Sequence, residues 1–273
     1  MWLVSDNPFS GDNLATVWNE VDGIRIHGRV SARATAGTVP LVFVHGLGVS
    51  TRYLEPTMRR LACEHPVAGL DLPGFGRSGG PPRTLTLVQL ADALLHWLDV
   101  RGIGPAVFVG NSFGCQVIVD CIARHPERAL GLVLNAPTMD PAHRTAAGQL
   151  LRVLADVPLE PFSLAVHVAR DYLRAGPLRL ITTLRAALAD RIEEKLPRIG
   201  VPVAVVCGER DPVVTVQWAD EVARLVGQER PGAPGATLHV IPRAAHAMPY
   251  DDPEQFAALV VALLARLPGA LRP

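Results

Sequence analysis

A serine between two glycines is the residue of this sequence best suited to nucleophilic chemistry. Residues 110–114 read Gly-Asn-Ser-Phe-Gly, directly after the apolar run 106–109 and before a stretch with helical periodicity. This G-x-S-x-G pattern holds a serine on a sharp turn from a strand to a helix, and Gly110 and Gly114 supply the small size that the turn needs. The alternative is an ordinary serine at a helix N-terminus. The placement favours Ser112 as a nucleophile.

A histidine in the right place would make that serine reactive, because a hydroxyl at its ordinary pKa needs a neighbouring base. The pattern delivers its partners in the chain order serine, acid, histidine. Of the histidines after Ser112, only His246 lies in a loop just past an expected strand, residues 237–241. The others fall at a helix end, within that strand or in the segment 137–197. We therefore predict that His246 is the base.

The acid that orients the histidine is expected at the end of another strand. Residues 208–212 read Gly-Glu-Arg-Asp-Pro and follow the apolar run 201–207. Asp211 thus stands at the carboxyl end of a strand, where α/β sheets carry their sites. Glu209 and Asp140 are the alternatives, and Asp140 is the stronger of the two because it lies just beyond another expected strand. We favour Asp211.

A glycine-flanked loop is suited to hold the negative charge that develops on a carbonyl oxygen. Residues 45–48 read His-Gly-Leu-Gly after the apolar run 41–44. The backbone N–H of Leu47 is our candidate donor, together with the N–H of Phe113 at the positive end of the helix after the serine. His45 is expected to hold this loop by hydrogen bonds rather than to transfer protons. The residues that we expect to support the site are His45, Gly46, Gly110, Asn111 and Gly114.

Short apolar runs alternate with longer helical stretches along most of the chain, which is typical of buried parallel strands joined by crossover helices. Before this alternation, residues 15–21 and 24–33 flank Asp22-Gly23 and predict a hairpin with a primed turn. The expected parallel strands are residues 40–44, 67–70, 105–109, 129–135, 201–207 and 237–241. The expected helices are residues 53–65, 86–101, 113–125, 216–226 and 253–267. The pattern predicts an α/β sheet.

The alternation of strands and helices is interrupted over residues 137–197. Here prolines separate amphipathic helical pieces, and no strand is expected. We interpret this segment as a helical cap inserted into one core, which consists of residues 1–136 and 198–273. Its apolar side chains should wall a pocket. Its arginines are expected on a solvated helical face rather than against an acidic substrate, and they are Arg152, Arg170, Arg174, Arg179 and Arg185.

Composition excludes several classes of protein. Of 273 residues, 49% are hydrophobic and 19% charged, which suits a chain with a large core rather than a disordered one. The chain has 26 Lys and Arg residues and 26 Asp and Glu residues, so its formal net charge is zero. No excess of positive charge is available to bind the phosphates of a nucleic acid. Residues 1–11 lack a secretory signal pattern, and no apolar run is long enough to span a bilayer. We expect a cytoplasmic protein with a small-molecule substrate and no membrane partner, and the oligomeric state is left open.

The cysteines indicate neither a disulfide framework nor a metal site. No C-x-x-C pair occurs, and each cysteine lies in a segment expected to be regular structure. We predict reduced thiols within the core for Cys63, Cys115, Cys121 and Cys207. Neither a cofactor nor a metal is expected.

Taken together, these motifs resemble the α/β-hydrolase superfamily over nearly the whole chain. The resemblance rests on five segments in the family's order, which are residues 45–48, 71–78, 110–114, 208–212 and 245–246. It implies a mostly parallel eight-stranded sheet flanked by helices, a helical cap after the sixth strand, and a catalytic triad at the strand ends. The family's epoxide hydrolases and haloalkane dehalogenases carry aspartate where this chain has Ser112, which disfavours their mechanism.

The asparagine before the nucleophile is similar to carbon–carbon bond hydrolases of ring-cleavage products, which often have Gly-Asn-Ser-x-Gly. Those enzymes usually have Trp after the histidine and a Gly-Pro-Gly type oxyanion loop, whereas here Ala247 follows His246 and Val49 follows Gly48. We therefore expect a serine hydrolase that acts on an ester or thioester of a small to medium apolar acid. Carbon–carbon cleavage or acyl transfer by the same residues is one alternative, and a ligand receptor on the hydrolase fold is another.

Overall fold

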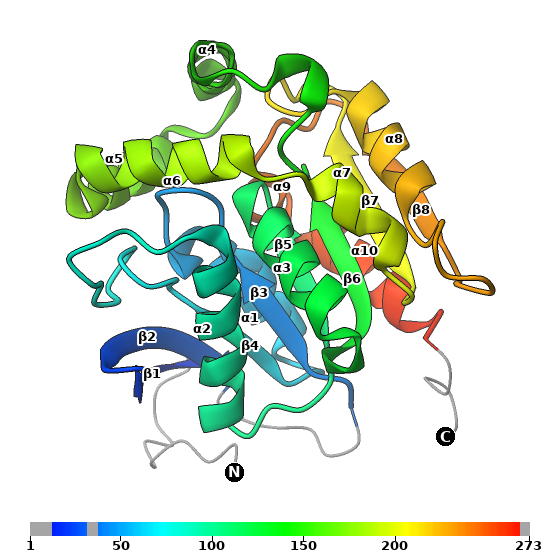
Figure 1. The fold of residues 1–273 in the computed structure, drawn as a ribbon, viewed down its shortest axis with the longest axis horizontal. Coiled ribbons are helices and arrows are strands. Elements are labelled where there is room, and N and C mark those ends of the chain that lie inside the picture. Colours follow the sequence, from blue (N-terminus) through cyan, green and yellow to red (C-terminus); the bar gives the residue numbers. More distant parts are fainter. Residues whose placement is uncertain (1–12, 32–37, 268–273) are drawn as a thin grey trace.

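The computed structural model describes residues 13–31 and 38–267 of the chain, and Figure 1 shows their arrangement. The strands of this part are β1 (Leu14–Val21), β2 (Ile24–Ser31), β3 (Leu41–Val44), β4 (Val67–Leu70), β5 (Ala106–Asn111), β6 (Ala129–Asn135), β7 (Val203–Gly208) and β8 (Ala236–Ile241). They form one eight-stranded sheet over the described residues, in the order β1-β2-β4-β3-β5-β6-β7-β8. The pairs β1–β2 and β2–β4 are antiparallel and the other pairs are parallel. The predicted mostly parallel sheet is confirmed.

The hairpin at the start of the sheet forms around Asp22 and Gly23. Their φ angles are 51° and 73°, which is the left-handed backbone that a primed two-residue turn requires. The strands β1 and β2 then pair in register from Val21↔Ile24 outward. The expected second strand ran to residue 33, and its last two positions lie outside the described residues, as do residues 1–11.

The parallel strands β3, β4, β5 and β7 are buried on both faces, which explains why they read as continuous apolar runs, whereas the edge strand β8 is only partly buried. Along β3, Val42 and Val44 pack into one hydrophobic cluster, whereas Leu41 and Phe43 pack into the other. The first cluster is closed by α2 (Leu87–Val100), α3 (Phe113–Arg124) and α8 (Val216–Leu225). The second is closed by α1 (Glu55–Leu61), α9 (Met248–Asp251) and α10 (Pro253–Leu264). The two clusters thus fill the space between the sheet and the helices on its two faces.

Helices also follow β6. They are α4 (Ala146–Asp156), α5 (Phe162–Ala175), α6 (Pro177–Ala189) and α7 (Ile192–Lys195), with short 3-10 turns η3 (Pro141–His143), η4 (Val157–Leu159) and η5 (Leu196–Arg198) between them. Figure 1 shows α4, α5 and α6 together beyond one end of the strands. Side chains from these helices share a cavity with residues that follow β3, β5, β6 and β7. The helices therefore lie over the carboxyl ends of the parallel strands.

One prediction is wrong at the end of α1. The expected helix over residues 53–65 is a 3-10 turn, η1 (Thr51–Leu54), followed by α1, which has Pro56 in its first turn and ends at Leu61. Cys63 lies in the turn beyond that end and is exposed, so it is not a core thiol. The other three cysteines are buried, and all four are free thiols.

Among the described residues, no helix combines the length and the apolar character needed to cross a bilayer.

Candidate active site

Ser112 stands on the turn between β5 and α3 with a backbone that non-glycine residues rarely adopt. Its φ is 57° and its ψ is −122°. A Cβ on Gly114 would collide with the Val44 carbonyl oxygen, and a Cβ on Gly110 would lie 2.9 Å from the Cys115 amide nitrogen. Only glycine fits at both positions, because the turn brings backbone against backbone. The strain at Ser112 is therefore held in place by close packing on either side.

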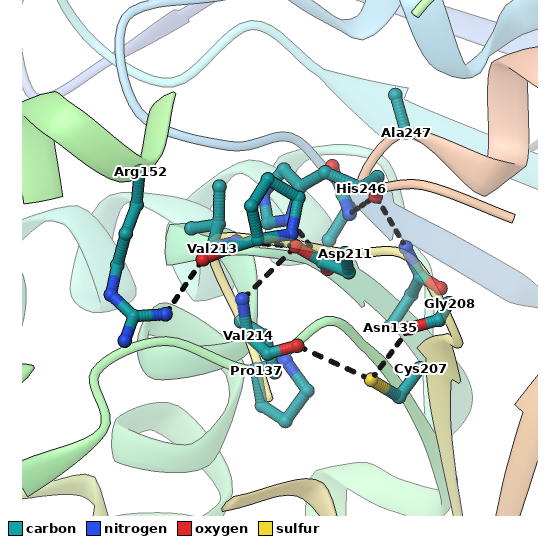
Figure 2. Close-up of polar contacts among 12 residues, drawn as sticks. Asn135, Pro137, Arg152, Cys207, Gly208, Asp211, Val213, Val214, His246 and Ala247 are labelled. Carbon is teal, nitrogen blue, oxygen red and sulfur yellow. Dashed lines mark hydrogen bonds and ion pairs between the residues drawn. The ribbon is translucent and has the colours of Figure 1, made fainter. Parts of the chain in front are cut away.

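His246 and Asp211 are brought together from the loops that follow β8 and β7. The imidazole Nδ1 lies 2.9 Å from Asp211 Oδ2. The other carboxylate oxygen accepts hydrogen bonds from the backbone N–H groups of Val213, at 2.7 Å, and Val214, at 3.0 Å. The Asp211 side chain is 0% exposed and the His246 side chain 15% exposed. Figure 2 shows how both carboxylate oxygens are occupied, which fixes the orientation of the ring.

The two alternative carboxylates, Asp140 and Glu209, accept hydrogen bonds from backbone N–H groups elsewhere. Asp140 Oδ1 accepts from the Ala142 N–H at 2.8 Å and caps the turn η3. Glu209 Oε2 accepts from the Arg243 N–H at 3.0 Å. Of the three carboxylates that the sequence offered, Asp211 is the one that contacts the imidazole.

Ser112 and His246 line one cavity of about 550 Å³, which we call the Ser112 cavity. Nδ1 of His246 is engaged by Asp211, so the other ring nitrogen is the one available to a hydroxyl. No hydrogen bond joins the Ser112 hydroxyl to the ring within the part of the chain that the structure describes. Such bonds commonly tighten only when a substrate is bound. The cavity thus holds a serine, an oriented imidazole and space for a ligand.

Two acidic residues near His246 were not found from the sequence. Asp156 at the end of α4 lines the same cavity as His246, and Glu160 after η4 accepts a hydrogen bond from the Ala247 N–H at 2.7 Å. One oxygen of each carboxyl group, Asp156 Oδ1 and Glu160 Oε2, is buried without a hydrogen-bond partner. No motif marks these residues, because they reach the histidine only through the packing of the helices after β6.

The charges around His246 change its basicity. Burial of the ring by itself lowers the pKa of His246, but the charge and hydrogen bond of Asp211, with the charges of Asp156 and Glu160, outweigh burial and raise that pKa to about 9. Burial raises the pKa of Asp156 to about 6 and the pKa of Glu160 to about 7. The negative charges stabilise the imidazolium that forms when the ring accepts a proton.

Tyr53 links the loop after β3 to the serine turn. Its hydroxyl accepts from the Gly46 N–H at 3.0 Å and donates to Asn111 Oδ1 at 2.6 Å. The Asn111 amide in turn donates to the His246 carbonyl at 3.3 Å. Leu47 and Phe113 both line the Ser112 cavity. Phe113 is the first residue of α3, so its N–H has no acceptor within the helix.

His45 lies fully buried beneath this loop. Its Nε2 accepts from the Leu72 N–H at 2.9 Å, so its proton sits on Nδ1, which donates to the Gly46 carbonyl at 2.8 Å. Burial lowers the pKa of His45, which keeps the ring neutral. The geometry gives His45 two backbone partners and no contact with the serine.

The walls of the Ser112 cavity are mostly apolar and come largely from the helices after β6, with Leu150, Val153, Leu164, Val168, Leu180 and Leu184 among them. Several of these walls are also open to solvent. Leu150 is 58% exposed, Val157 54% and Ile181 50%. The opening of the cavity is therefore itself apolar. Among the described residues, no group of three or more His, Cys, Asp or Glu side chains is arranged to hold a metal ion.

The arginines of the helices after β6 do not all lie on one solvent-exposed face. Arg152 donates to the Pro212 carbonyl at 2.6 Å, next to Asp211 (Figure 2), and Arg179 donates to the Pro81 carbonyl at 3.1 Å. The expectation of one solvated face is wrong for these two residues, because each reaches a loop of the core. Arg170 and Arg174 lie on the opposite face of α5 from the Ser112 cavity.

Comparison with known families agrees with this geometry. The model of the alpha/beta hydrolase family matches residues 41–259. The chain belongs to this family and is an enzyme of the hydrolase class. A protein of Mycobacterium phage D29 that carries the name of a non-heme haloperoxidase is 30% identical over 272 positions, which cover 89% of this chain and 92% of that protein. A pimeloyl-[acyl-carrier protein] methyl ester esterase of Neisseria meningitidis serogroup A is 27% identical, with 79% and 73% covered.

Solved structures share the fold. An N-acyl homoserine lactone degrading enzyme is 26% identical and has a TM-score of 0.73, with 90% of this chain and 99% of that chain covered. A membrane phospholipase A has a TM-score of 0.78 at 21% identity, with 93% and 87% covered, and this likeness shows the fold alone.

Proposed function

We propose that the protein is a serine hydrolase that cleaves an ester or thioester of a small to medium apolar acyl group. Ser112 is the nucleophile, His246 the base and Asp211 the acid that orients the base. The observation that carries the proposal is the Asp211–His246 contact of 2.9 Å beside the strained Ser112 turn in one apolar cavity. A carboxylate held by two backbone N–H groups and an imidazole is the arrangement that fixes a catalytic histidine.

The reaction follows from the positions of these groups. His246 takes the proton of Ser112 while the serine oxygen attacks the acyl carbon, and the N–H groups of Leu47 and Phe113 bind the oxyanion. The imidazolium then gives its proton to the leaving oxygen or sulfur, which departs and leaves an acyl-enzyme. His246 next takes a proton from water while the water oxygen attacks the acyl carbon. The imidazolium then returns this proton to the Ser112 oxygen as the acid is released.

The helices between β6 and β7 act in this proposal as a cap, residues 137–197, over a core of residues 1–136 and 198–273. The cap supplies apolar walls and an apolar opening, which suit an apolar acyl chain. It also supplies Glu160, which accepts a hydrogen bond from the Ala247 N–H, and Asp156, whose charge raises the pKa of His246. We assign Glu160 a positioning role, because it ties the loop of the base to the cap.

Two similar proteins carry names of substrates that contain an ester group, which supports this substrate class. One is the methyl ester esterase of Neisseria meningitidis, and the other is the N-acyl homoserine lactone degrading enzyme. Methyl esters and lactones both offer the carbonyl carbon that the mechanism requires. The small-molecule substrate is therefore proposed to be a carboxylic ester, and the mechanism requires no cofactor.

A panel of p-nitrophenyl esters from acetate to dodecanoate tests the proposal. We expect wild type to prefer acyl chains of short to medium length, and Ser112→Ala to lose at least about 10³-fold in kcat/KM. Ser163→Ala is the matched control, because Ser163 is an exposed serine on α5 whose hydroxyl accepts a hydrogen bond from Tyr250. Turnover by Ser112→Ala at the wild-type rate would refute the proposal.

A further inference from the structure

A second cavity, of about 240 Å³, lies between α5 and the core, and we call it the arginine cavity. Arginines from β2, η1, the loop after β4 and α5 line it, and they are Arg29, Arg52, Arg77, Arg170 and Arg174. It shares no residue with the Ser112 cavity, although α5 contributes to both. At 100° per residue, Val168 and Tyr172 fall on one face of α5, and Arg170 and Arg174 fall on the opposite face. The helix is thus a wall between two chemically different spaces.

The carboxylates of the arginine cavity already have partners. Glu55 forms ion pairs with Arg29 at 3.0 Å and with Arg59 at 2.9 Å. Asp71 contacts His27 at 2.9 Å and accepts from the Thr51 N–H at 2.8 Å. The Ser50 hydroxyl donates to buried Asp171 at 2.5 Å.

Three of the five arginines, in contrast, have side chains without a partner in the part of the chain that the structure describes. Arg29 is paired with Glu55, and Arg77 lies 3.4 Å from His27 Nε2 and 5.3 Å from the centre of the Trp18 ring. The side chains of Arg52, Arg170 and Arg174 are exposed and form neither an ion pair nor a hydrogen bond with any described residue. Arg29 Nε is buried and has no hydrogen-bond partner, although the rest of its guanidinium is paired. Five guanidinium groups here face three carboxylates, in a chain whose formal net charge is zero. The positive charge at this place is therefore a local excess.

We propose that the arginine cavity is a binding site for a small phosphate-type oxyanion. Guanidinium groups donate in a planar fork that matches the oxygens of a phosphate, and each remains charged at any physiological pH. The volume is below the roughly 300–1,000 Å³ typical of sites for drug-sized ligands, so the cavity suits a compact anion or the anionic end of a larger molecule. A cation would meet an excess of like charge, and an apolar ligand would leave the guanidinium donors unpaired.

The position of these arginines gives the site a second property. Arg170 and Arg174 come from α5 in the proposed cap, whereas Arg52 comes from η1 on the core. A bound oxyanion would bridge the two parts, on the face of α5 that points away from Ser112. The site does not depend on the proposed hydrolase mechanism, since none of its residues takes part in it.

Isothermal titration calorimetry of the full chain with inorganic phosphate tests the proposal, with sodium chloride at matched ionic strength as the reference. We expect saturable one-to-one binding by wild type and at least a tenfold loss of affinity in the double variant Arg52→Gln/Arg170→Gln. Arg185→Gln is the matched control, because Arg185 is an exposed arginine of α6 that forms no ion pair with a residue that the structure describes. It is expected to bind phosphate within twofold of wild type.

Circular dichroism and turnover of p-nitrophenyl acetate establish that the variants are folded. If the double variant is unfolded, Arg174→Gln takes its place, with a loss of affinity of at least threefold expected. A second arm compares phenyl phosphate with inorganic phosphate. Tighter binding of phenyl phosphate identifies a phosphate carried on an organic molecule, equal or weaker binding identifies free phosphate, and both support the site. Absence of saturable binding by wild type, or wild-type affinity in the folded variants, would overturn the proposal.

Discussion

The Ser112 cavity and the arginine cavity lie on opposite faces of α5 and differ in which groups they leave unpaired. In the first, about 550 Å³ of mostly apolar space surrounds an imidazole whose orientation Asp211 fixes. In the second, about 240 Å³ is lined by guanidinium groups whose nearby carboxylates already have partners. The 3.6-residue helical period lets one helix present an apolar wall to one space and charged side chains to the other. The two proposals therefore predict that catalysis and anion binding can be removed separately.

The largest expected effect concerns the orienting acid. Asp211→Asn should lower kcat by about 10⁴-fold, because the neutral amide favours the wrong tautomer of His246 and withdraws the charge that stabilises the imidazolium. Steady-state kinetics with a p-nitrophenyl ester measure the loss, and phosphate affinity should be unchanged. Asp140→Asn is the matched control and should stay within a few-fold of wild type. The reverse result, with Asp140→Asn inactive, would mean that the wrong carboxylate has been chosen.

A second effect concerns stability and separates the two faces of α5. Leu164 is buried at 4% exposure and lines the Ser112 cavity, so Leu164→Ala should lower the free energy of unfolding by about 2–5 kcal/mol. Arg174→Gln on the opposite face should change it by less than about 0.5 kcal/mol. Urea denaturation measures both values. Leu173→Ala, at an 85% exposed leucine of the same helix, is the matched control and should also be near neutral. If Leu164→Ala and Arg174→Gln lowered the free energy of unfolding equally, the proposed difference between the two faces of α5 would be contradicted.

A third effect concerns pH. His246 acts as a base only when neutral, and its pKa is raised to about 9, so kcat/KM of wild type should rise with pH toward about 9. Glu160 is one of the charges that raise this pKa, and its removal in Glu160→Gln should move the rising limb to lower pH. A pH–rate profile with an uncharged ester measures the shift. Arg174→Gln serves as the control and should leave the pH–rate profile unchanged. If the rising limb of Glu160→Gln moved to higher pH, the role of Glu160 in raising the pKa of His246 would be contradicted.

The smallest effect concerns salt. Raising sodium chloride from 50 to 500 mM shortens the Debye length from roughly 14 Å to about 4 Å, so phosphate affinity should fall several-fold. KM for an uncharged ester in the Ser112 cavity should change by less than about twofold. Calorimetry and steady-state kinetics in the same buffers compare the two sites. A salt-independent phosphate affinity would show that the guanidinium charges do not carry the binding.

Much of the fold could be predicted from the sequence, because the apolar runs and turn residues indicate the same strands and turns that the packed structure has. Apolar runs marked the parallel strands, and Asp22-Gly23 marked the hairpin turn that the φ angles confirm. The chain order of Ser112, Asp211 and His246 singled out residues that the structure brings to one edge of the sheet.

The remainder depends on how the helices after β6 pack, which no local pattern encodes. Asp156 and Glu160 contact the histidine loop only through that packing, and Arg152 reaches the loop of Asp211 in the same way. Cys63 was placed in the core because its helix was expected to be longer than it is. Contacts between side chains that are far apart in the sequence therefore could not be predicted from the sequence.

The central claim is that the Ser112 oxygen is an activated nucleophile. Mass spectrometry of the protein after treatment with a fluorophosphonate probe tests it most directly. We predict one covalent adduct on the peptide that contains Ser112, slow labelling of His246→Ala, and no adduct on Ser112→Ala. An adduct that persists at the same rate in Ser112→Ala would contradict the account.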